Sequence, residues 1–127
     1  MSRPKEFEPE AVVDAAKDLF WRRGYANTSM QDLVDHLGVG RGSIYDTFGS
    51  KHELWIQALA KYCDDGAQEI LATLEGPGPL LHRLRDALLA MVDRDLRDSD
   101  RKGCMLVNAA METLPGDPDT AKLARRN

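Results

Sequence analysis

Several hydrogen-bond donors stand close together between residues 41 and 47, with few apolar residues among them. The segment from Arg41 to Phe48 has only Ile44 and Phe48 as firmly apolar positions, one helical turn apart. A helix that turns those two side chains inward presents the others outward. The outward residues are Arg41, Gly42, Ser43, Tyr45 and Thr47. Arginine can bridge guanine O6 and N7, serine can bond either base edge, and tyrosine can reach phosphate or a thymine methyl group.

This pattern predicts a helix that reads DNA. We expect Arg41 and Ser43 to contact base edges, while Gly42 keeps the surface low enough for close approach. The expected contacts with the DNA backbone come from Thr28, Tyr45, Thr47 and Lys51. Thr28 and Lys51 stand at helix starts, where free N–H groups attract phosphate. Asp46 is the exception on this helix, because it must point away from phosphates or accept from a cytosine amine.

The flanking residues predict the helices that would hold this face in place. Thr28 and Gln31 have the T-x-x-Q spacing of a capping box, and Ser50 with Glu53 repeats it before the next helix. Between these boundaries, a stripe of apolar residues at helical spacing ends at Gly38, which suits a left-handed turn. The stripe consists of Met30, Leu33, Val34 and Leu37. The run indicates a helix-turn-helix, although any helical hairpin with a glycine turn shares part of the pattern.

The remaining chain is also read as helical, with no convincing strand. A helix is expected from Pro9 to Gly24, and a long one from Lys51 to Glu75. The GPGP sequence at 76–79 breaks the chain, and the next helix has an apolar side formed by Leu81, Leu84, Leu88, Met91, Val92 and Leu96. The segment from Cys104 to Leu114 is apolar almost all round, so we expect it to be buried. A last helix starts at Asp117 and Pro118.

Composition limits the class of protein. The chain has 127 residues, 43% of them hydrophobic and 30% charged, which describes one ordinary globular domain. It has no apolar run long enough for a membrane span and no secretory start, so we expect a cytoplasmic location with no membrane partner and with Cys63 and Cys104 reduced. The net charge of −4 argues against broad attraction to nucleic acid, so DNA affinity must depend on local placement of cations.

We find no constellation of residues typical of an enzyme, and we predict no cofactor and no metal. His36, His52 and His82 are each isolated from cysteine or carboxylate at ligand spacing. Cys104 follows Arg101 and Lys102, so it is a candidate thiol sensor, although a buried structural cysteine is the commoner role. Aromatic and apolar residues at helical spacing either form plain core or border a ligand pocket. The candidates for the pocket are Trp55, Tyr62, Leu88, Met91, Met105 and Met111.

Two motifs resemble the TetR family of bacterial transcriptional regulators. Phe20, Gly24, Tyr25 and Thr28 match an F-x-x-x-G-[YF]-x-x-[TS] pattern, and residues 38–51 match G-V-x-x-G-[ST]-[IL]-Y-x-x-F-x-[SN]-K. The match is specific and covers about residues 8–60 closely. Val34 and Gly40 depart from the family pattern, which commonly has a small residue and a Ser or Thr at these places.

The resemblance implies an all-α protein with two parts. Residues 1–50 would form a three-helix DNA-binding domain, and residues 51–127 a connecting helix with part of a ligand-binding and dimerisation domain. The implied function is a homodimeric repressor that leaves a palindromic operator when it binds a small-molecule effector. Because family members are usually longer, we expect either a truncated form or a compact variant. The competing interpretation is a helical module that binds a protein or a small molecule and does not read DNA.

Overall fold

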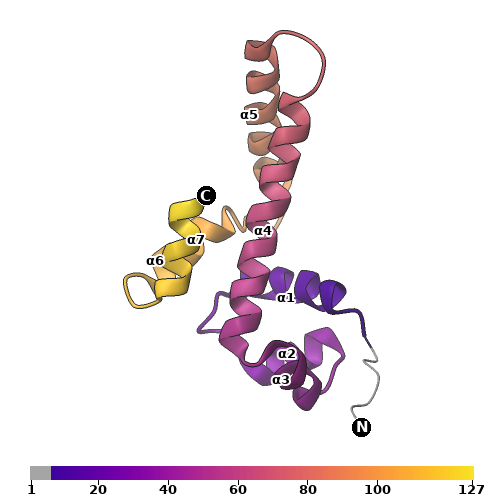
Figure 1. The fold of residues 1–127 in the computed structure, drawn as a ribbon, viewed down its shortest axis with the longest axis vertical. Helices are drawn as coiled ribbons and strands as arrows, with labels where there is room; N and C mark the ends of the chain where they lie inside the picture. Colours follow the sequence, from indigo (N-terminus) through magenta and orange to yellow (C-terminus); the bar gives the residue numbers. More distant parts are fainter. Residues whose placement is uncertain (1–6) are drawn as a thin grey trace.

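The computed structural model describes residues 7–127, and this part of the chain forms seven helices and no strand. They are α1 (Pro9–Arg23), α2 (Met30–Leu37), α3 (Arg41–Phe48), α4 (Lys51–Leu74), α5 (Leu80–Arg97), α6 (Met105–Thr113) and α7 (Pro118–Arg126). The predicted all-α class is confirmed. The first six residues of the predicted domain 1–50 lie outside the described part. Figure 1 shows α4 as the axis along which the other helices are arranged.

The first three helices gather around the N-terminal end of α4 and share one core with it. The rings of Phe20 from α1 and Trp55 from α4 meet edge to face, with centroids 5.2 Å apart. Leu33 of α2 and Ile44 of α3 are fully buried in the same cluster. Since each helix contributes at least one buried apolar side chain, the position of α3 is fixed by packing against all its neighbours.

The boundaries of α2 differ from the prediction at one end. Gly38 ends the helix in the left-handed conformation, with φ 68°, as its place after the apolar stripe predicts. The N-cap, however, is Ser29 and not Thr28, and the capping box pairs Ser29 with Asp32 instead of Thr28 with Gln31. Thr28 is buried, and its hydroxyl donates to the Gly24 carbonyl at 2.7 Å. The turn after α1 draws Thr28 inward, which leaves the cap to the next hydroxyl.

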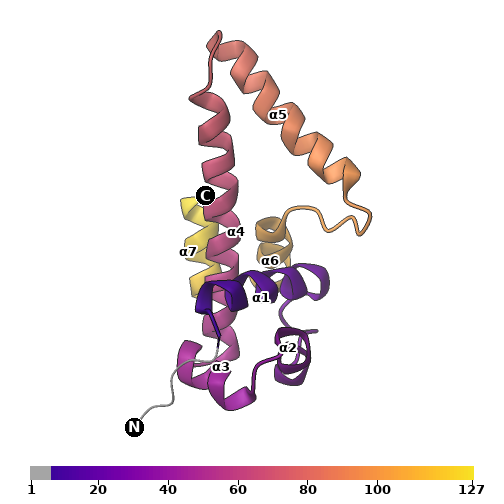
Figure 2. The same ribbon diagram turned by 90° about the vertical axis from the view of Figure 1, so that its right-hand side faces the viewer.

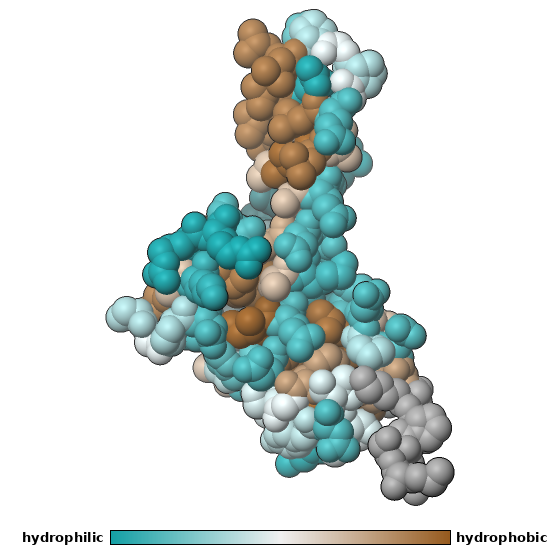
Figure 3. Space-filling view, viewed as in Figure 1, coloured by the Kyte–Doolittle hydropathy of each residue, from teal (hydrophilic) through white to brown (hydrophobic). Residues whose placement is uncertain are grey.

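Helix α5 returns beside α4 after the break at residues 76–79, but the two helices diverge (Figure 2). Ala87 is the buried residue of α5, and the predicted apolar side is exposed instead. The exposed residues are Leu81, Leu84, Leu88, Met91, Val92 and Leu96. This apolar side stays open to solvent because α5 packs along a narrow line and no other described helix covers it. Figure 3 shows the resulting apolar surface at this end of the molecule.

Helix α6 packs against α4, and α7 lies beside the first part of α4, where His52 and Trp55 meet Asp117 and Thr120. Met105 and Ala109 of α6 are buried, whereas Val107 and Met111 are exposed. The expectation that the whole segment is buried is therefore wrong, because a short helix here packs through a single stripe. In the described part of the chain, no helix is both long and apolar enough to cross a membrane.

Candidate nucleic-acid interface

Helix α3 is divided into a buried face and an exposed face. Ile44 and Phe48 are buried against the neighbouring helices, as their spacing predicts. Arg41, Gly42 and Ser43 are exposed at the N-terminal end, and Tyr45 is 45% exposed. The predicted reading face is therefore open to solvent on a rigidly packed helix, and contact of these residues with bases and backbone stays a prediction.

Two exposed residues at the start of α3, Arg41 and Gly42, make few contacts with the rest of the protein. The Arg41 Nη2 atom donates to the Gln31 Oε1 atom at 3.2 Å, which links α3 to α2. A guanidinium carries five N–H donors, so most of them stay available for another partner. A Cβ atom added at Gly42 would meet no protein atom within 4 Å. Internal packing therefore does not require glycine here, which is consistent with an external reason for the small residue.

A reciprocal capping box closes the start of α2, which lies beside the reading helix. The Ser29 hydroxyl accepts from the Asp32 N–H at 3.0 Å, and the Asp32 carboxylate accepts from the Ser29 N–H at 2.9 Å. The predicted backbone contact at Thr28 needs correction, because its side chain is buried and its hydroxyl is already bonded. Ser29, which is exposed, is the N-cap of α2, one position after the residue that the sequence pattern predicted.

Ser29→Ala is expected to lower the free energy of unfolding by about 1 kcal/mol, because it removes an N-cap acceptor. The hydrogen bonds from the Ser29 backbone and side chain hold the pKa of Asp32 below its usual value. The contribution of the Asp32 carboxylate to the free energy of unfolding is thus present above the ordinary pKa of an aspartate. It is lost as pH falls through the lowered pKa. Urea denaturation at neutral and acidic pH checks both effects. Ser99→Ala, at an exposed loop position, is the control.

Lys51 stands at the first turn of α4, directly after the N-cap Ser50. The Ser50 hydroxyl accepts from the Glu53 N–H at 3.1 Å, which is one half of the predicted capping box. The Lys51 ammonium lies 4.2 Å from the centroid of the Tyr25 ring. Burial lowers the pKa of Lys51, and Glu112 opposes that shift by raising it. The cation is therefore held near the turn between α1 and α2, beside the capped start of α2.

The C-terminal part of the chain holds the end of α1 and the turn between α1 and α2 in place. No sequence pattern predicted these contacts. The Glu112 carboxylate of α6 accepts from the backbone N–H groups of Tyr25 at 2.9 Å and Ala26 at 2.7 Å. Trp21 at the end of α1 donates its indole N–H to the Gly103 carbonyl at 3.0 Å. These contacts join residues more than eighty positions apart, so no local pattern could predict them.

His52 also meets carboxylates that are distant in the sequence. Its Nε2 atom lies 2.9 Å from Asp117 Oδ2 and 3.9 Å from Asp119 Oδ2, so the expectation of an isolated histidine is wrong. Burial alone would raise the pKa of Asp117, but hydrogen bonds from His52 and Thr120 hold it below its usual value. Asp117 therefore stays ionised at neutral pH.

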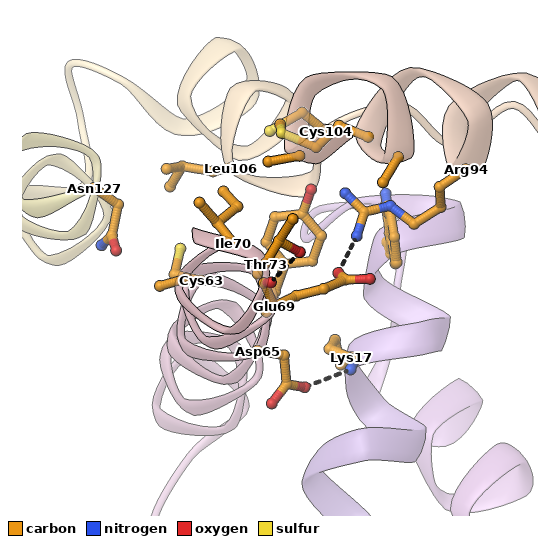
Figure 4. Close-up of a pocket in the computed structure, with 17 residues that line it drawn as sticks. Lys17, Cys63, Asp65, Glu69, Ile70, Thr73, Arg94, Cys104, Leu106 and Asn127 are labelled. Atoms are coloured by element: carbon orange, nitrogen blue, oxygen red, sulfur yellow. Dashed lines mark hydrogen bonds and ion pairs between the residues drawn. The ribbon is translucent and has the colours of Figure 1, made fainter. Parts of the chain in front are cut away.

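A cavity of about 380 Å³ lies between α1, α4, α5 and the start of α6 (Figure 4). Its apolar lining includes Ile70 and Leu106. Two ion pairs lie at its wall: Lys17 with Asp65 at 3.4 Å, and Arg94 with Glu69 at 2.7 Å. Because α1 and α4 both belong to the core behind α3, a molecule in this cavity would touch the elements that position the reading face.

Two of the six residues predicted for a pocket, Tyr62 and Met91, line this cavity. For the other four the prediction is wrong with respect to this cavity. Trp55 and Met105 are fully buried in the core, while Leu88 and Met111 are 63% and 82% exposed. Helical spacing identifies the apolar residues but cannot tell which neighbour each one meets.

Cys104 is exposed, forms the N-cap position of α6, and lines the cavity together with the buried Cys63. Burial and a hydrogen bond with Cys104 raise the pKa of the Tyr62 phenol to about 12. Lys102, one of the basic residues before Cys104, is bonded to Asp98 at 3.0 Å and lies over the Trp21 ring. Cys104 is therefore accessible rather than buried, and its role as a thiol sensor stays a prediction.

The comparisons with known proteins agree with this geometry. Residues 12–58 match the sequence model of the family described as bacterial regulatory proteins, tetR family. The chain is 39% identical over 127 residues to the uncharacterized HTH-type transcriptional regulator YezE of Bacillus subtilis (strain 168), covering 99% of this chain and 65% of YezE. The chain belongs to the TetR family.

Two further proteins are similar to this TetR-family chain. It is 30% identical over 119 residues to the HTH-type transcriptional repressor BdcR of Escherichia coli (strain K12), covering 94% of this chain and 60% of BdcR. The fold resembles the TetR family transcriptional regulator CifR, solved as a cysteine mutant with 26-base-pair double-strand operator DNA. The TM-score is 0.77 and the identity 30%, with 98% of this chain and 63% of CifR covered. The chain thus spans less than two thirds of the length of these relatives.

Proposed function

We propose that this TetR-family protein is a sequence-specific DNA-binding transcriptional regulator that acts as a repressor. The observation that carries the proposal is the exposed polar face at the start of α3, held in place by the buried Ile44 and Phe48. The capped starts of α2 and α4 lie on either side of it in the sequence. An α-helix fits the major groove of B-DNA, and N–H groups at helix starts bind phosphate.

In this proposal, Arg41 and Ser43 contact base edges, and Gly42 permits close approach to them. Tyr45, Thr47 and Lys51 contact the backbone, and the exposed Ser29 takes the place first assigned to Thr28. The chain carries a net charge of −4, so it would attract DNA weakly outside these residues. A homodimer would overcome this by placing two α3 helices one DNA turn apart on a palindromic operator. The repressor BdcR and the CifR–operator complex support this assignment.

We further propose that a small-molecule effector in the 380 Å³ cavity releases the DNA. The cavity wall includes Lys17 and Trp21 of α1 and Tyr62 of α4. These helices form the core that supports α3, so a ligand that separates them would change the position of the reading face. A ligand can shift the equilibrium between the DNA-binding and the released arrangement of these helices only by its difference in affinity for the two. Met91, which can adapt its shape, is the lining residue most suited to varied apolar ligands.

The proposal is tested by fluorescence-anisotropy titration against mixed genomic DNA fragments at two salt concentrations. Binding that weakens steeply with salt, and that enriches particular fragments, is the expected result. A verified dimer that shows no salt-sensitive binding would favour the competing role, a helical module for a protein or small-molecule partner.

Lys51→Ala is expected to weaken binding to all duplexes alike and to reduce the slope of log affinity against log salt by about 1, because one phosphate contact is lost. The substitution also frees the Tyr25 ring, so circular dichroism must show that the helices are retained. Lys122→Ala on α7, an exposed position away from α3, is the matched control. A change in sequence preference without a change in slope would contradict the backbone role of Lys51.

A further inference from the structure

The cleft between the start of α4 and the start of α7 brings together an imidazole and two carboxylates. His52 Nε2, one oxygen of Asp117 and one of Asp119 all lie within 4.8 Å of one another. The cleft they line, with Tyr25 and Glu112, has a volume of about 510 Å³ and is open to solvent. This cluster lies apart from the reading face of α3 and from the 380 Å³ cavity. We propose that His52, Asp117 and Asp119 bind a divalent transition-metal cation of the Zn²⁺ type.

The distances fit one ion without movement of the backbone. Nitrogen and oxygen ligands lie about 2.0–2.2 Å from Zn²⁺, so two ligands of one ion are roughly 3–4 Å apart, depending on the angle between them. His52 Nε2 is hydrogen-bonded to Asp117 Oδ2 at 2.9 Å and lies 3.9 Å from Asp119 Oδ2, so an entering cation would replace the proton between His52 and Asp117 and release it to solvent. The Asp119 side chain is 60% exposed, so it can rotate to close the remaining pair.

Hydrogen bonds to both carboxylate oxygens hold Asp117 in place, and one of them reaches Oδ2, the oxygen that faces His52. Its Oδ1 atom accepts from the N–H groups that start α7, and the buried Thr120 hydroxyl donates to its Oδ2 atom at 3.0 Å. The Thr120 oxygen also accepts from the Trp55 indole N–H, at 3.4 Å. Supporting hydrogen bonds of this kind orient metal ligands in proteins. Three protein ligands leave coordination positions for water or for a further group.

An ion at this location would link the start of α4 to the start of α7. His52 follows Lys51 at the start of α4, and Asp117 and Asp119 belong to the start of α7, which lies beside α4 in both views (Figures 1 and 2). A bound cation would join His52 on α4 to Asp117 and Asp119 at the start of α7 through three metal–ligand bonds. It would therefore hold the C-terminal helices against the part of α4 that adjoins the reading unit.

The test is calorimetric titration of Zn²⁺ into the chelator-treated chain and its D119N variant. We expect one ion per chain, with the affinity of D119N lowered by at least about 10-fold, the loss that even supporting groups of metal sites produce. D119N is the sharpest variant because Asp119 is exposed and does not cap α7. H52Q is the second variant, and D95N and H82A, both at exposed positions on α5, are the matched controls. Equal affinity of D119N and the parent chain would overturn the proposal.

Cobalt supplies an independent test of which atoms bind. Co²⁺ bound by nitrogen and oxygen is expected to give only weak visible bands, and these should be lost in D119N. An intense ultraviolet band of thiolate coordination would place the ion at Cys63 or Cys104 instead and would contradict the site. The expected spectrum of the C104S variant is the same as that of the parent chain. Circular dichroism of every variant in the presence of chelator distinguishes loss of ligands from loss of folding.

Discussion

Arg41→Ala is expected to weaken binding to a selected operator by about 1–3 kcal/mol, which corresponds to roughly 5- to 150-fold in affinity. The reason is that arginine can make two parallel hydrogen bonds to guanine, which no backbone contact replaces. Arg41 is exposed, and its observed partner is the neutral amide of Gln31, so the change removes little internal structure. Anisotropy titration against the selected duplex and a scrambled duplex measures both affinity and preference.

The decisive comparison for Arg41 is between the two duplexes. Loss of a base contact should reduce affinity for the selected duplex and leave the scrambled one nearly unchanged. Arg85→Ala on α5, an exposed arginine outside the proposed interface, controls for the loss of one positive charge. If Arg41→Ala weakened both duplexes equally, Arg41 would be a backbone contact and the proposed division between it and Lys51 would be wrong.

Ile44→Ala is expected to lower the free energy of unfolding by about 2–5 kcal/mol, because it leaves a cavity in a packed core. Ile44 has no solvent exposure and lies in the cluster shared by α1, α2, α3 and α4. Its neighbours Ser43 and Tyr45 are on the exposed side of the same helix. Substitution of those neighbours by alanine should change stability by no more than about 0.5 kcal/mol. Urea denaturation followed by circular dichroism measures each value.

Ile44→Val is the graded control, with an expected loss of about 0.5–1.5 kcal/mol. A loss for Ser43→Ala that matched the one for Ile44→Ala would contradict the division of α3 into two faces. Ile44→Ala is expected to lower DNA binding only by unfolding part of the protein. Cooling toward the temperature of maximum stability raises the folded fraction and should therefore restore DNA binding. Arg41→Ala should show no such recovery, since its loss is local to the interface.

The sequence by itself determined the helices and the division of α3. The apolar spacing of Ile44 and Phe48, the glycine at 38 and the serine at 50 act within a few residues of one another, so local rules are sufficient. Local rules fail at Thr28 because two adjacent hydroxyl residues compete for one cap. Only the packing of the preceding turn decides that Thr28 is buried and that Ser29 caps the helix.

Only the tertiary structure decided which distant residues meet. The Glu112 carboxylate reaches the turn after α1, and His52 meets Asp117 across 65 positions of sequence, because α6 and α7 fold back along α4. The same folding places Tyr62 in the cavity and Trp55 in the core, although both follow one helical pattern. Periodicity indicates which side of a helix is apolar, but the partner of that side depends on the path of the whole chain. The reading face is therefore a property of local sequence, whereas the cavity and the His52 cluster are properties of the fold.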